Sequence, residues 1–277
     1  MSLEKLFGIK GKICVITGAA GLLAKAHISA VVEGGGIPVL LDKNGDALML
    51  RLNSIKLAYP KAKTEHFIVD ITDKKQLAKI AETLLKKYGH VDALINNVAN
   101  NPKVESSSDN MISNSFCDFP LNIWEQDINV GLTGTFVITQ IFCKIFESQK
   151  SGIIINVSSD YGLIAPDQRI YEVDGKNPKE QIKKPVTYSV VKHALIGFTK
   201  YLAAYYAQVG IRVNTLCPAS IFNNQNEEFV AKVSKLIPLG RMSYVDEYVS
   251  TILYMLSDSC SYMTGATIVL DGGRTII

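Results

Sequence analysis

Short apolar runs alternate with longer helical stretches along the whole chain. The expected strands are residues 13–17, 37–41, 64–69, 91–96, 153–157, 211–216 and 267–270. The expected helices are residues 22–33, 45–58, 73–88, 121–149, 186–209 and 244–257. Most of the strand runs are apolar throughout, which is typical of parallel strands covered on both faces. The alternation therefore predicts an α/β fold, a doubly wound parallel sheet of about seven strands with helices on both faces.

Two stretches interrupt this alternation. Residues 100–120 are rich in Ser and Asn, and residues 160–185 combine prolines with mixed charges. Loops of this length are commonly lids or disordered segments. Both follow strands at the carboxyl edge of the sheet, where open α/β sheets bind ligands. We therefore expect one domain spanning residues 1–277, with loop insertions at 100–120 and 160–185 on the substrate side.

The composition excludes several classes of partner. The chain has 277 residues, and 29 basic against 26 acidic side chains leave a net charge of +3, so we expect no nucleic-acid partner. Five cysteines form no C-x-x-C pair, which argues against a zinc site and favours a reduced cytoplasmic compartment. The amino terminus lacks the apolar segment of a signal peptide, and no apolar run approaches the roughly 20 residues that span a bilayer. We expect a cytoplasmic protein without metal or membrane contact.

The first expected strand leads directly into the turn Thr17-Gly18-Ala19-Ala20-Gly21-Leu22-Leu23-Ala24 and then into a helix. Glycines in a strand–turn–helix unit let backbone N–H groups approach a pyrophosphate at the helix N-terminus. We expect this turn to bind phosphate through Thr17, Gly18, Gly21, Leu22 and Leu23. The alternative is a plain tight turn.

The second expected strand ends at an acidic residue, Asp42. A carboxylate at this position accepts hydrogen bonds from the ribose hydroxyls of NAD and repels a 2′-phosphate. Lys25 could attract that phosphate, but its position beside a packed alanine favours a solvated side chain. We expect NAD as the cofactor in preference to NADP.

Tyr188 and Lys192 are four residues apart on an expected helix, and therefore share one face. A tyrosine that acts as acid and base near neutrality needs its pKa lowered by roughly 2–3 units. One ammonium at about 4 Å supplies on the order of 4 kcal/mol at an effective dielectric constant near 20. Tyr59 and Lys63 repeat the spacing, so context decides. Only Tyr188 follows a buried strand that ends at Ser159, whose hydroxyl could polarise a carbonyl.

Over nearly its whole length, the chain resembles the single-domain branch of the short-chain dehydrogenase/reductase family. The matching pieces are T-G-x-x-G at 17–21, Asp42, V-D-I-T at 69–72, Asn96-Asn97, D-I-N-V-G around Asn129, I-I-N-V-S-S ending at Ser159, Y-S-V-V-K at 188–192, R-V-N-T-L-C-P ending at Pro218, Y-M-T-G at 262–265 and L-D-G-G at 270–273. In combination these motifs are highly specific.

The resemblance implies a Rossmann-type fold and an oxidoreductase that interconverts a secondary alcohol and a ketone by hydride transfer. Tyr188 would donate and accept the proton, Ser159 would steady the reacting oxygen, and Asn129 would anchor a water that relays protons to Lys192. Lys192 would also hold the nicotinamide ribose. The remaining cofactor-binding residues would be Asp70 and Ile71 beside the adenine, Asn96 at the ribose, and Asn97, Val98, Pro218 and Ile221. Relatives pair through helices that correspond to residues 121–149 and 186–209, so a homodimer or homotetramer is expected.

Some residues depart from the family pattern. Ala24, Ala99 and Ala219 stand where glycine is common, and could tighten the cofactor pocket. The segment between Ser159 and Tyr188 is longer than is usual, and the excess is the insertion at 160–185.

The spellings N-N-P-K at 100–103, I-A-P-D-Q-R-I-Y at 164–171 and P-V-T-Y-S-V-V-K at 185–192 are similar to a narrower group. Its members are bacterial oxidoreductases linked to amino-sugar precursors of flagellin glycans and surface polysaccharides. A sugar substrate would suit the polar residues of 220–225 and of the insertion, among which Arg169 could anchor an anion and Tyr171 could contact the substrate. Loops are commonly polar without any such role, and this alternative stays open.

Two other functions compete with the oxidoreductase. A sensor or scaffold of the same fold would bind the dinucleotide without turnover, and would show a broken catalytic set. Epimerases and dehydratases that act on sugar nucleotides use the same Tyr–Lys pair, but they usually need a larger carboxy-terminal substrate domain than the seven residues after Leu270.

Overall fold

The computed structural model describes residues 3–100, 115–173, 175–177 and 181–277. Its centre is a seven-stranded sheet with the order β3-β2-β1-β4-β5-β6-β7, in which every neighbouring pair is parallel. The strands are β1 Ile13–Thr17, β2 Ile37–Asp42, β3 Glu65–Ile68, β4 Ala93–Asn96, β5 Gly152–Val157, β6 Ile211–Pro218 and β7 Thr267–Leu270. This order confirms the doubly wound, Rossmann-type sheet.

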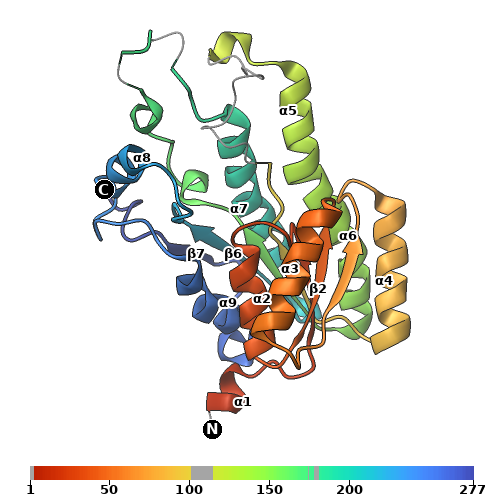
Figure 1. The fold of residues 1–277 in the computed structure, drawn as a ribbon. Helices are drawn as coiled ribbons and strands as arrows, with labels where there is room; N and C mark the ends of the chain where they lie inside the picture. Colours follow the sequence, from red (N-terminus) through yellow and green to blue (C-terminus); the bar gives the residue numbers. More distant parts are fainter. Residues whose placement is uncertain (1–2, 101–114, 174, 178–180) are drawn as a thin grey trace.

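Helices cover both faces of the sheet (Figure 1). They are α1 Leu3–Phe7, α2 Ala24–Glu33, α3 Gly45–Ala58, α4 Lys74–Tyr88, α5 Leu121–Ile128, α6 Gly134–Gln149, α7 Val186–Tyr206, α8 Glu227–Ser234 and α9 Val249–Leu256. Apolar side chains of α2, α3 and α9 share one core layer with the sheet, and those of α4, α6 and α7 share the other. The five central strands, β2, β1, β4, β5 and β6, are thus shielded from water on both sides, as their apolar sequences indicate.

Polar residues fix several helix ends. The side chain of Asn44 accepts a hydrogen bond from the backbone N–H of Ala47 at the start of α3, and Asp73 caps α4 in the same way. Gly89 ends α4 at a φ of +78°, a left-handed conformation that glycine adopts without a steric penalty.

The structure differs from the sequence expectation at the sheet edge and in two short helices. The edge strand β3 alternates between half-buried and exposed residues, because only the face that carries Phe67 packs against the core. Helix α1 was not expected, and neither was α8, which lies in a polar stretch after β6. The cap of Asn226 starts α8, and Phe229 and Val233 pack it against Ile237.

The expected helix 121–149 is divided into α5, a π-helical turn at Asn129–Thr133, and α6. By length and composition alone, Leu121–Gln149 could cross a membrane, contrary to the sequence expectation. This is weak evidence, because half of its most apolar stretch is buried inside the protein. These residues contact α4 and α7, as a core helix does.

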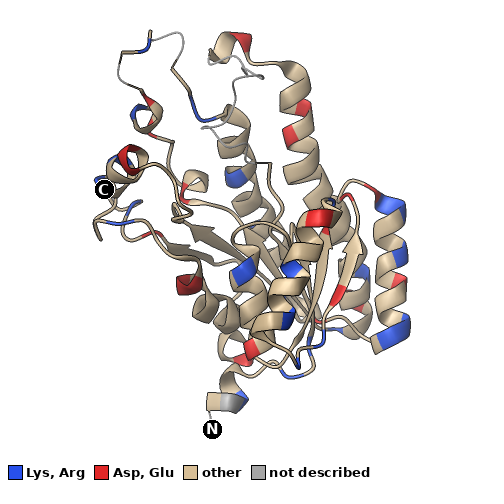
Figure 2. Ribbon diagram, in the orientation of Figure 1, with Lys and Arg blue, Asp and Glu red and all other residues tan. Residues whose placement is uncertain are grey.

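Hydrogen bonds between side chains and the backbone connect distant parts of the described portion of the expected insertion at 160–185. Gln181 both donates to and accepts from the backbone of Val173, and Gln168 does the same with Lys184. Residues 101–114, most of the other expected insertion, lie outside the described residues. Figure 2 shows charges of both signs distributed over the ribbon, with a concentration of lysines on α4.

A chain of buried polar side chains crosses the sheet near its carboxyl edge. The Asn96 amide donates to Thr139 at 2.9 Å and to Asn156 at 2.8 Å, and the Asn156 amide donates to Thr199 at 2.8 Å. Thr215 continues the chain by donating to Thr199. These bonds join β4, β5 and β6 to α6 and α7.

Replacing the centre of this chain should destabilise the fold. In Asn156→Leu, the Asn96 amide and the Thr199 hydroxyl each lose a buried partner, so we expect the free energy of unfolding to fall by about 1–3 kcal/mol. Urea denaturation measures this change. The matched surface variant, Asn122→Leu on α5, should shift stability by less than about 0.5 kcal/mol. Equal effects of the two variants would contradict the structural role.

Candidate active site

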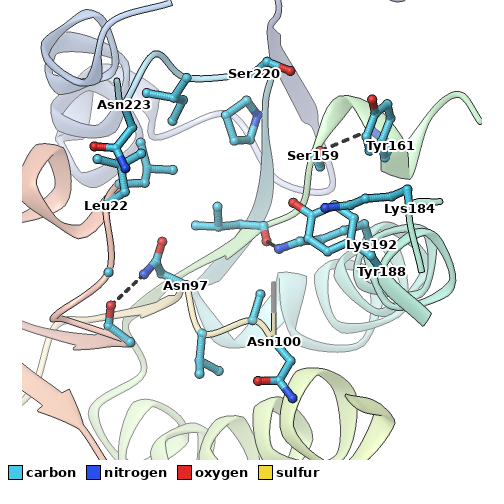
Figure 3. A pocket seen from close by; sticks show the side chains of 18 of the residues that line it. Leu22, Asn97, Asn100, Ser159, Tyr161, Lys184, Tyr188, Lys192, Ser220 and Asn223 are labelled. Atoms are coloured by element: carbon cyan, nitrogen blue, oxygen red, sulfur yellow. Dashed lines mark hydrogen bonds between the residues drawn. The ribbon is translucent and has the colours of Figure 1, made fainter. Parts of the chain in front are cut away.

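A cavity of about 880 Å³ opens at the carboxyl edge of the sheet. The residues that line it lie at or just after the ends of six strands, at Thr17–Gly18, Asp42, Asp70, Asn97, Ser159 and Pro218. Parallel strands bring these loops to one edge, which is where doubly wound sheets bind their ligands. The cavity joins the glycine turn to the Tyr188 region (Figure 3).

The glycine turn is held tightly against the end of β4. Gly18 has a φ of +61°, and a Cβ at this residue would lie 3.0 Å from the Cα of Val98. The Asn97 amide donates to the carbonyls of Thr17 and Gly18, both at 3.1 Å. In return, the Thr17 hydroxyl accepts the backbone N–H groups of Asn97 and Val98. A side chain at position 18 would therefore separate two connected loops.

His27 supports Asn97 from beneath the turn. It is fully buried, and its Nε2 lies 3.1 Å from the Asn97 Oδ1. Because the Asn97 Nδ2 already donates twice, its Oδ1 is the acceptor, and the Nε2 of His27 must carry the proton. Burial lowers the pKa of His27 to about 4, and its Nδ1 has no partner to receive a second proton. His27 is therefore a neutral structural residue.

Asp42 lies over the same turn. Its two carboxylate oxygens accept the backbone N–H groups of Ala20 and Asn44, both at 2.9 Å. Lys25, the possible competing cation, pairs with Asp246 at 3.3 Å and does not line the cavity. Asp42 is thus a fixed carboxylate at the end of β2, and the next residue, Lys43, also lines the cavity.

The other expected cofactor-binding residues fall into two groups. Those that line the main cavity are Gly21, Leu22, Leu23, Asp70, Ile71, Val98, Pro218 and Ile221. Asn96 does not line it, because its side chain is held in the buried polar chain by Thr139 and Asn156. Neighbouring residues at a strand end point in opposite directions, and Asn97 takes the cavity side.

Tyr188 lies among charged side chains at the other end of the cavity (Figure 3). The Lys192 Nζ lies 5.6 Å from the centre of its ring and donates to the Val157 carbonyl at 2.8 Å. A second ammonium, that of Lys184, lies 4.0 Å from the ring centre. The Tyr161 ring meets Tyr188 edge-on at 6.4 Å between centroids.

Burial dominates the ionisation of this cluster. It raises the pKa of Tyr188 to about 12; the Ser159 hydroxyl acts in the opposite direction, and the Asp160 carboxylate acts in the same direction. Burial also lowers the pKa of Lys192 to about 8. The expected fall in the Tyr188 pKa is therefore not what this geometry gives, because burial penalises the phenolate and the Asp160 carboxylate adds to that effect. Near neutrality Tyr188 is a phenol.

Sequence reasoning missed Asp160 and Lys184. The Ser159 hydroxyl donates to the buried Asp160 carboxylate at 2.6 Å, next to the position expected for the reacting oxygen. Asp160 directly follows the serine motif and Lys184 lies four residues before Tyr188, just ahead of α7, but both residues belong to the stretch that was treated as an insertion. Their positions relative to known motifs were the available signal.

Asn129 is not where the resemblance places it. It is exposed, and it lines neither the main cavity nor the small one beside Lys192. Gly131 lines that small cavity instead. Two residues along a helix differ in direction by about 200°, so positions 129 and 131 face opposite sides.

Of the two expected substrate residues, only Tyr171 lines the cavity. Its ring packs at 5.7 Å from that of Phe229. Arg169 does not line the cavity: its guanidinium pairs with Asp167 at 2.7 Å, and its side chain is 80% exposed. A four-residue 3₁₀ helix at Gln168–Tyr171 carries both residues and directs their side chains apart.

The structure predicts a pH dependence of stability that depends on His27. Its folded pKa of about 4 lies below the unfolded value of about 6.5, so the unfolded state binds more protons between these pH values. This stabilisation is present above about pH 6.5 and is lost as the pH falls toward 4. Relative to neutral pH, the loss at pH 4.5 is about 2–3 kcal/mol.

Urea denaturation of the wild type and of His27→Gln at pH 7 and at pH 4.5 measures this contribution. The loss of stability between pH 7 and pH 4.5 should be smaller by that amount than in the wild type. His193→Gln, an exposed position on α7, should retain the full loss. If the free energy of unfolding fell equally with pH in the wild type and in His27→Gln, the role of His27 would be refuted.

Comparison with known proteins agrees with this architecture. The family described as short chain dehydrogenase matches residues 12–233. The NAD-dependent glycerol dehydrogenase of Listeria innocua is 30% identical, over 99% of this chain and 97% of its own length. The post-translational flagellin modification protein A of Campylobacter coli is 27% identical, over 96% of this chain and 98% of its own length.

The fold agrees as well. The crystal structure of a short-chain type dehydrogenase/reductase from Mycobacterium marinum superimposes with a TM-score of 0.82 at 28% identity, covering 100% of both chains. The match extends from the glycine turn through the Tyr188 helix to the end of the sheet. This chain belongs to the short-chain dehydrogenase family.

Proposed function

We propose that this protein is an NAD(H)-dependent oxidoreductase that interconverts a secondary alcohol and a ketone, with Tyr188 as the acid and base. One observation carries the proposal: the buried Ser159 and Lys192 and the half-buried Tyr188 share a single cavity with the glycine turn and Asp42. A redox reaction at a carbinol carbon needs a hydride carrier and a proton donor side by side, and this cavity has residues suited to both.

The glycine turn fits a dinucleotide. Position 18 has no room for a Cβ, and the turn leads into α2, whose N-terminal end suits a pyrophosphate. Asp42 would accept the adenosine ribose hydroxyls, and Asp70 and Ile71 would flank the adenine. Lys192 would hold the nicotinamide ribose, next to Pro218. When bound, the nicotinamide supplies or accepts the hydride.

The side chains at the end of the cavity away from the glycine turn would transfer the proton. A pKa of about 12 keeps Tyr188 protonated near neutrality, so in the direction of reduction it can donate to the oxygen that gains negative charge. Ser159 would steady the same oxygen. Lys192, with a pKa of about 8, would return a proton to Tyr188 after each turnover.

The substrate is proposed to be a sugar or amino-sugar derivative. The rim of the cavity beyond Tyr188 carries hydrogen-bonding side chains, which are Tyr161, Tyr171, Ser220, Asn223, Gln225 and Asn226. Gln225 and Asn226 already bond to the backbone of Asn223, Ile221 and Phe229, and a hydroxyl-rich ligand would find further hydrogen-bonding groups along the same rim. The similarity to a protein named for flagellin modification supports the same substrate class.

A non-catalytic sensor or scaffold is the second candidate. The position of Asn129 favours it, because one member of the expected catalytic set faces solvent. Against it stand Ser159, Tyr188 and Lys192 around one cavity. Turnover separates the two functions.

Assembly remains a prediction. Phe136, Tyr201 and Tyr205 are large exposed side chains on α6 and α7, the helices expected to pair in a dimer or tetramer. A monomer in sedimentation at micromolar concentration would contradict this prediction.

A calorimetric titration with NADH and NADPH tests the cofactor proposal. We expect tight NADH and weak NADPH binding, because Asp42 repels the 2′-phosphate. In Asp42→Ala this preference should shrink by at least tenfold, about 1.4 kcal/mol. Asp46→Ala, an exposed acid on α3, is the matched control and should retain the preference. Unchanged discrimination in Asp42→Ala would reject the role, and binding of neither nucleotide would reject the function.

A screen of ketoses and nucleotide-linked keto sugars, monitored by NADH absorbance, tests catalysis. Tyr188→Phe should lower kcat by roughly 10²–10⁴-fold with NADH affinity nearly unchanged, since the proton donor is lost and the ring remains. Tyr201→Phe, exposed on the same helix, should keep full activity. A substrate that turns over equally well with Tyr188→Phe would exclude Tyr188 as the acid, and no turnover of any keto sugar would favour the scaffold.

A further inference from the structure

Lys184 brings a second ammonium to the Tyr188 end of the main cavity. Its Nζ lies 4.0 Å from the centre of the Tyr188 ring, closer than the Lys192 Nζ at 5.6 Å. Both lysines line the cavity, and Figure 3 shows both side chains beside the ring. Lys192 donates to the Val157 carbonyl and is the residue proposed to hold the nicotinamide ribose. No step of the proposed reaction uses Lys184.

The backbone around Lys184 is fixed on both sides. The Gln168 side chain accepts the backbone N–H of Lys184 at 2.8 Å and donates to its carbonyl at 3.4 Å. Pro185 follows as the N-cap residue of α7, and a proline also restricts the residue before it. Lys184 itself is half-buried, and burial lowers its pKa to about 8, which still leaves it mostly protonated at neutral pH. An anionic ligand would compensate the hydration that this ammonium has lost.

The charges around Tyr188 favour an anion. The carboxylate in this region belongs to Asp160, whose Oδ1 accepts the Ser159 hydroxyl at 2.6 Å and the backbone N–H of Tyr161 at 2.8 Å. The acids at the rim of the cavity each pair with a lysine, in Glu228–Lys232 and Glu172–Lys183. Among the lining residues that the structure describes, two ammonium groups and one carboxylate therefore surround the ring.

We propose that Lys184 binds an anionic group of the substrate, a carboxylate or a phosphate, next to the carbonyl that is reduced. The proposal rests on the oxidoreductase function proposed above and narrows its substrate class to acidic keto sugars. The Tyr188 hydroxyl is the para substituent of the ring that Lys184 covers. An anion on Lys184 therefore lies within a few bonds of the oxygen that accepts the Tyr188 proton. An ammonium has three N–H donors, so it can hold this anion while it stays over the ring.

The geometry distinguishes this role from simple packing over the ring. A lysine that only packs usually lays its methylene groups on the apolar surface and extends its ammonium into water. Here the Nζ itself lies over the Tyr188 ring and is partly removed from water. Arg169, which the sequence suggested as an anion anchor, pairs with Asp167 outside the cavity. Lys184 comes from the same segment and does line the cavity.

The first test measures binding without turnover. D-fructose, 2-keto-D-gluconate and D-fructose 1-phosphate share the same ketone and differ only at the neighbouring terminal carbon, which bears a hydroxyl, forms a carboxylate or bears a phosphate. Each is titrated calorimetrically into the protein saturated with NAD⁺, which cannot reduce a ketone. One of the two anions should bind roughly tenfold or more tightly than fructose, because hydrogen bonds to charged groups are the stronger ones.

The preferred anion identifies the group. Tighter binding of 2-keto-D-gluconate indicates a carboxylate, and tighter binding of D-fructose 1-phosphate indicates a phosphate. If neither anion binds more tightly than fructose, the proposal is overturned. An equal gain for D-fructose 6-phosphate, whose phosphate lies at the far end of the sugar, would contradict the position next to the carbonyl.

The second test assigns the preference to one side chain. Lys184→Met keeps an unbranched chain over the ring but removes the charge, so the preference for the anion over fructose should fall below about threefold. Lys183→Met makes the same change one residue earlier and is the matched control, because Lys183 pairs with Glu172 and does not line the cavity. It should retain the full preference. NAD⁺ binding shows that each variant is folded, and Lys184→Gln replaces Lys184→Met if the latter does not bind NAD⁺.

The outcomes separate this proposal from the function on which it rests. With NAD⁺ bound, a preference for the anion that Lys184→Met leaves intact, or that Lys183→Met removes equally, overturns the role of Lys184 while the oxidoreductase function stands. Reduction of the same compounds by NADH should show the same preference in kcat/KM. A protein that binds neither form of the cofactor, or that reduces no keto sugar, would instead reject the oxidoreductase function and this proposal with it.

Discussion

The arrangement of the cavity depends on the contact between the glycine turn and the end of β4. The two loops approach so closely that Gly18 has no room for a Cβ, and the Asn97 amide joins them through two backbone carbonyls. His27 fixes the orientation of that amide from the buried side. Because the turn cannot move independently of β4, the N-terminal end of α2 and the carboxylate of Asp42 stay in fixed relation to the rest of the cavity.

A second constraint is the burial of charge around Tyr188. Two lysines and Asp160 lie near the ring. Burial of each group raises the pKa of Tyr188 to about 12 and lowers that of Lys192 to about 8. Coulomb attraction alone suggested a lowered tyrosine pKa, since an ammonium at about 4 Å is worth several kcal/mol. Desolvation is of similar size and acts on every member of the cluster, which is why the sign differs from the simple pairwise estimate.

Three of the expected site residues do not line the cavities, although the motifs that contain them are present. Asn96, Asn129 and Arg169 each lie within a few residues of one that lines a cavity, namely Asn97, Gly131 and Tyr171. A motif fixes where a segment lies in the fold, but one step along a strand or two along a helix reverses the direction of a side chain.

The sequence by itself determined the order of strands and helices, the parallel sheet and the family. Apolar runs, the turn at 17–24 and the Y-x-x-x-K spacing depend on local geometry, which a short stretch of chain specifies on its own. It also identified Tyr188, Lys192, Ser159 and Asp42 as the residues to examine. Only the tertiary structure decided which asparagine faces the cavity, which lysine lies against the Tyr188 ring, and how the tyrosine ionises. Those properties depend on desolvation and on contacts between segments far apart in the chain, and no local pattern records them.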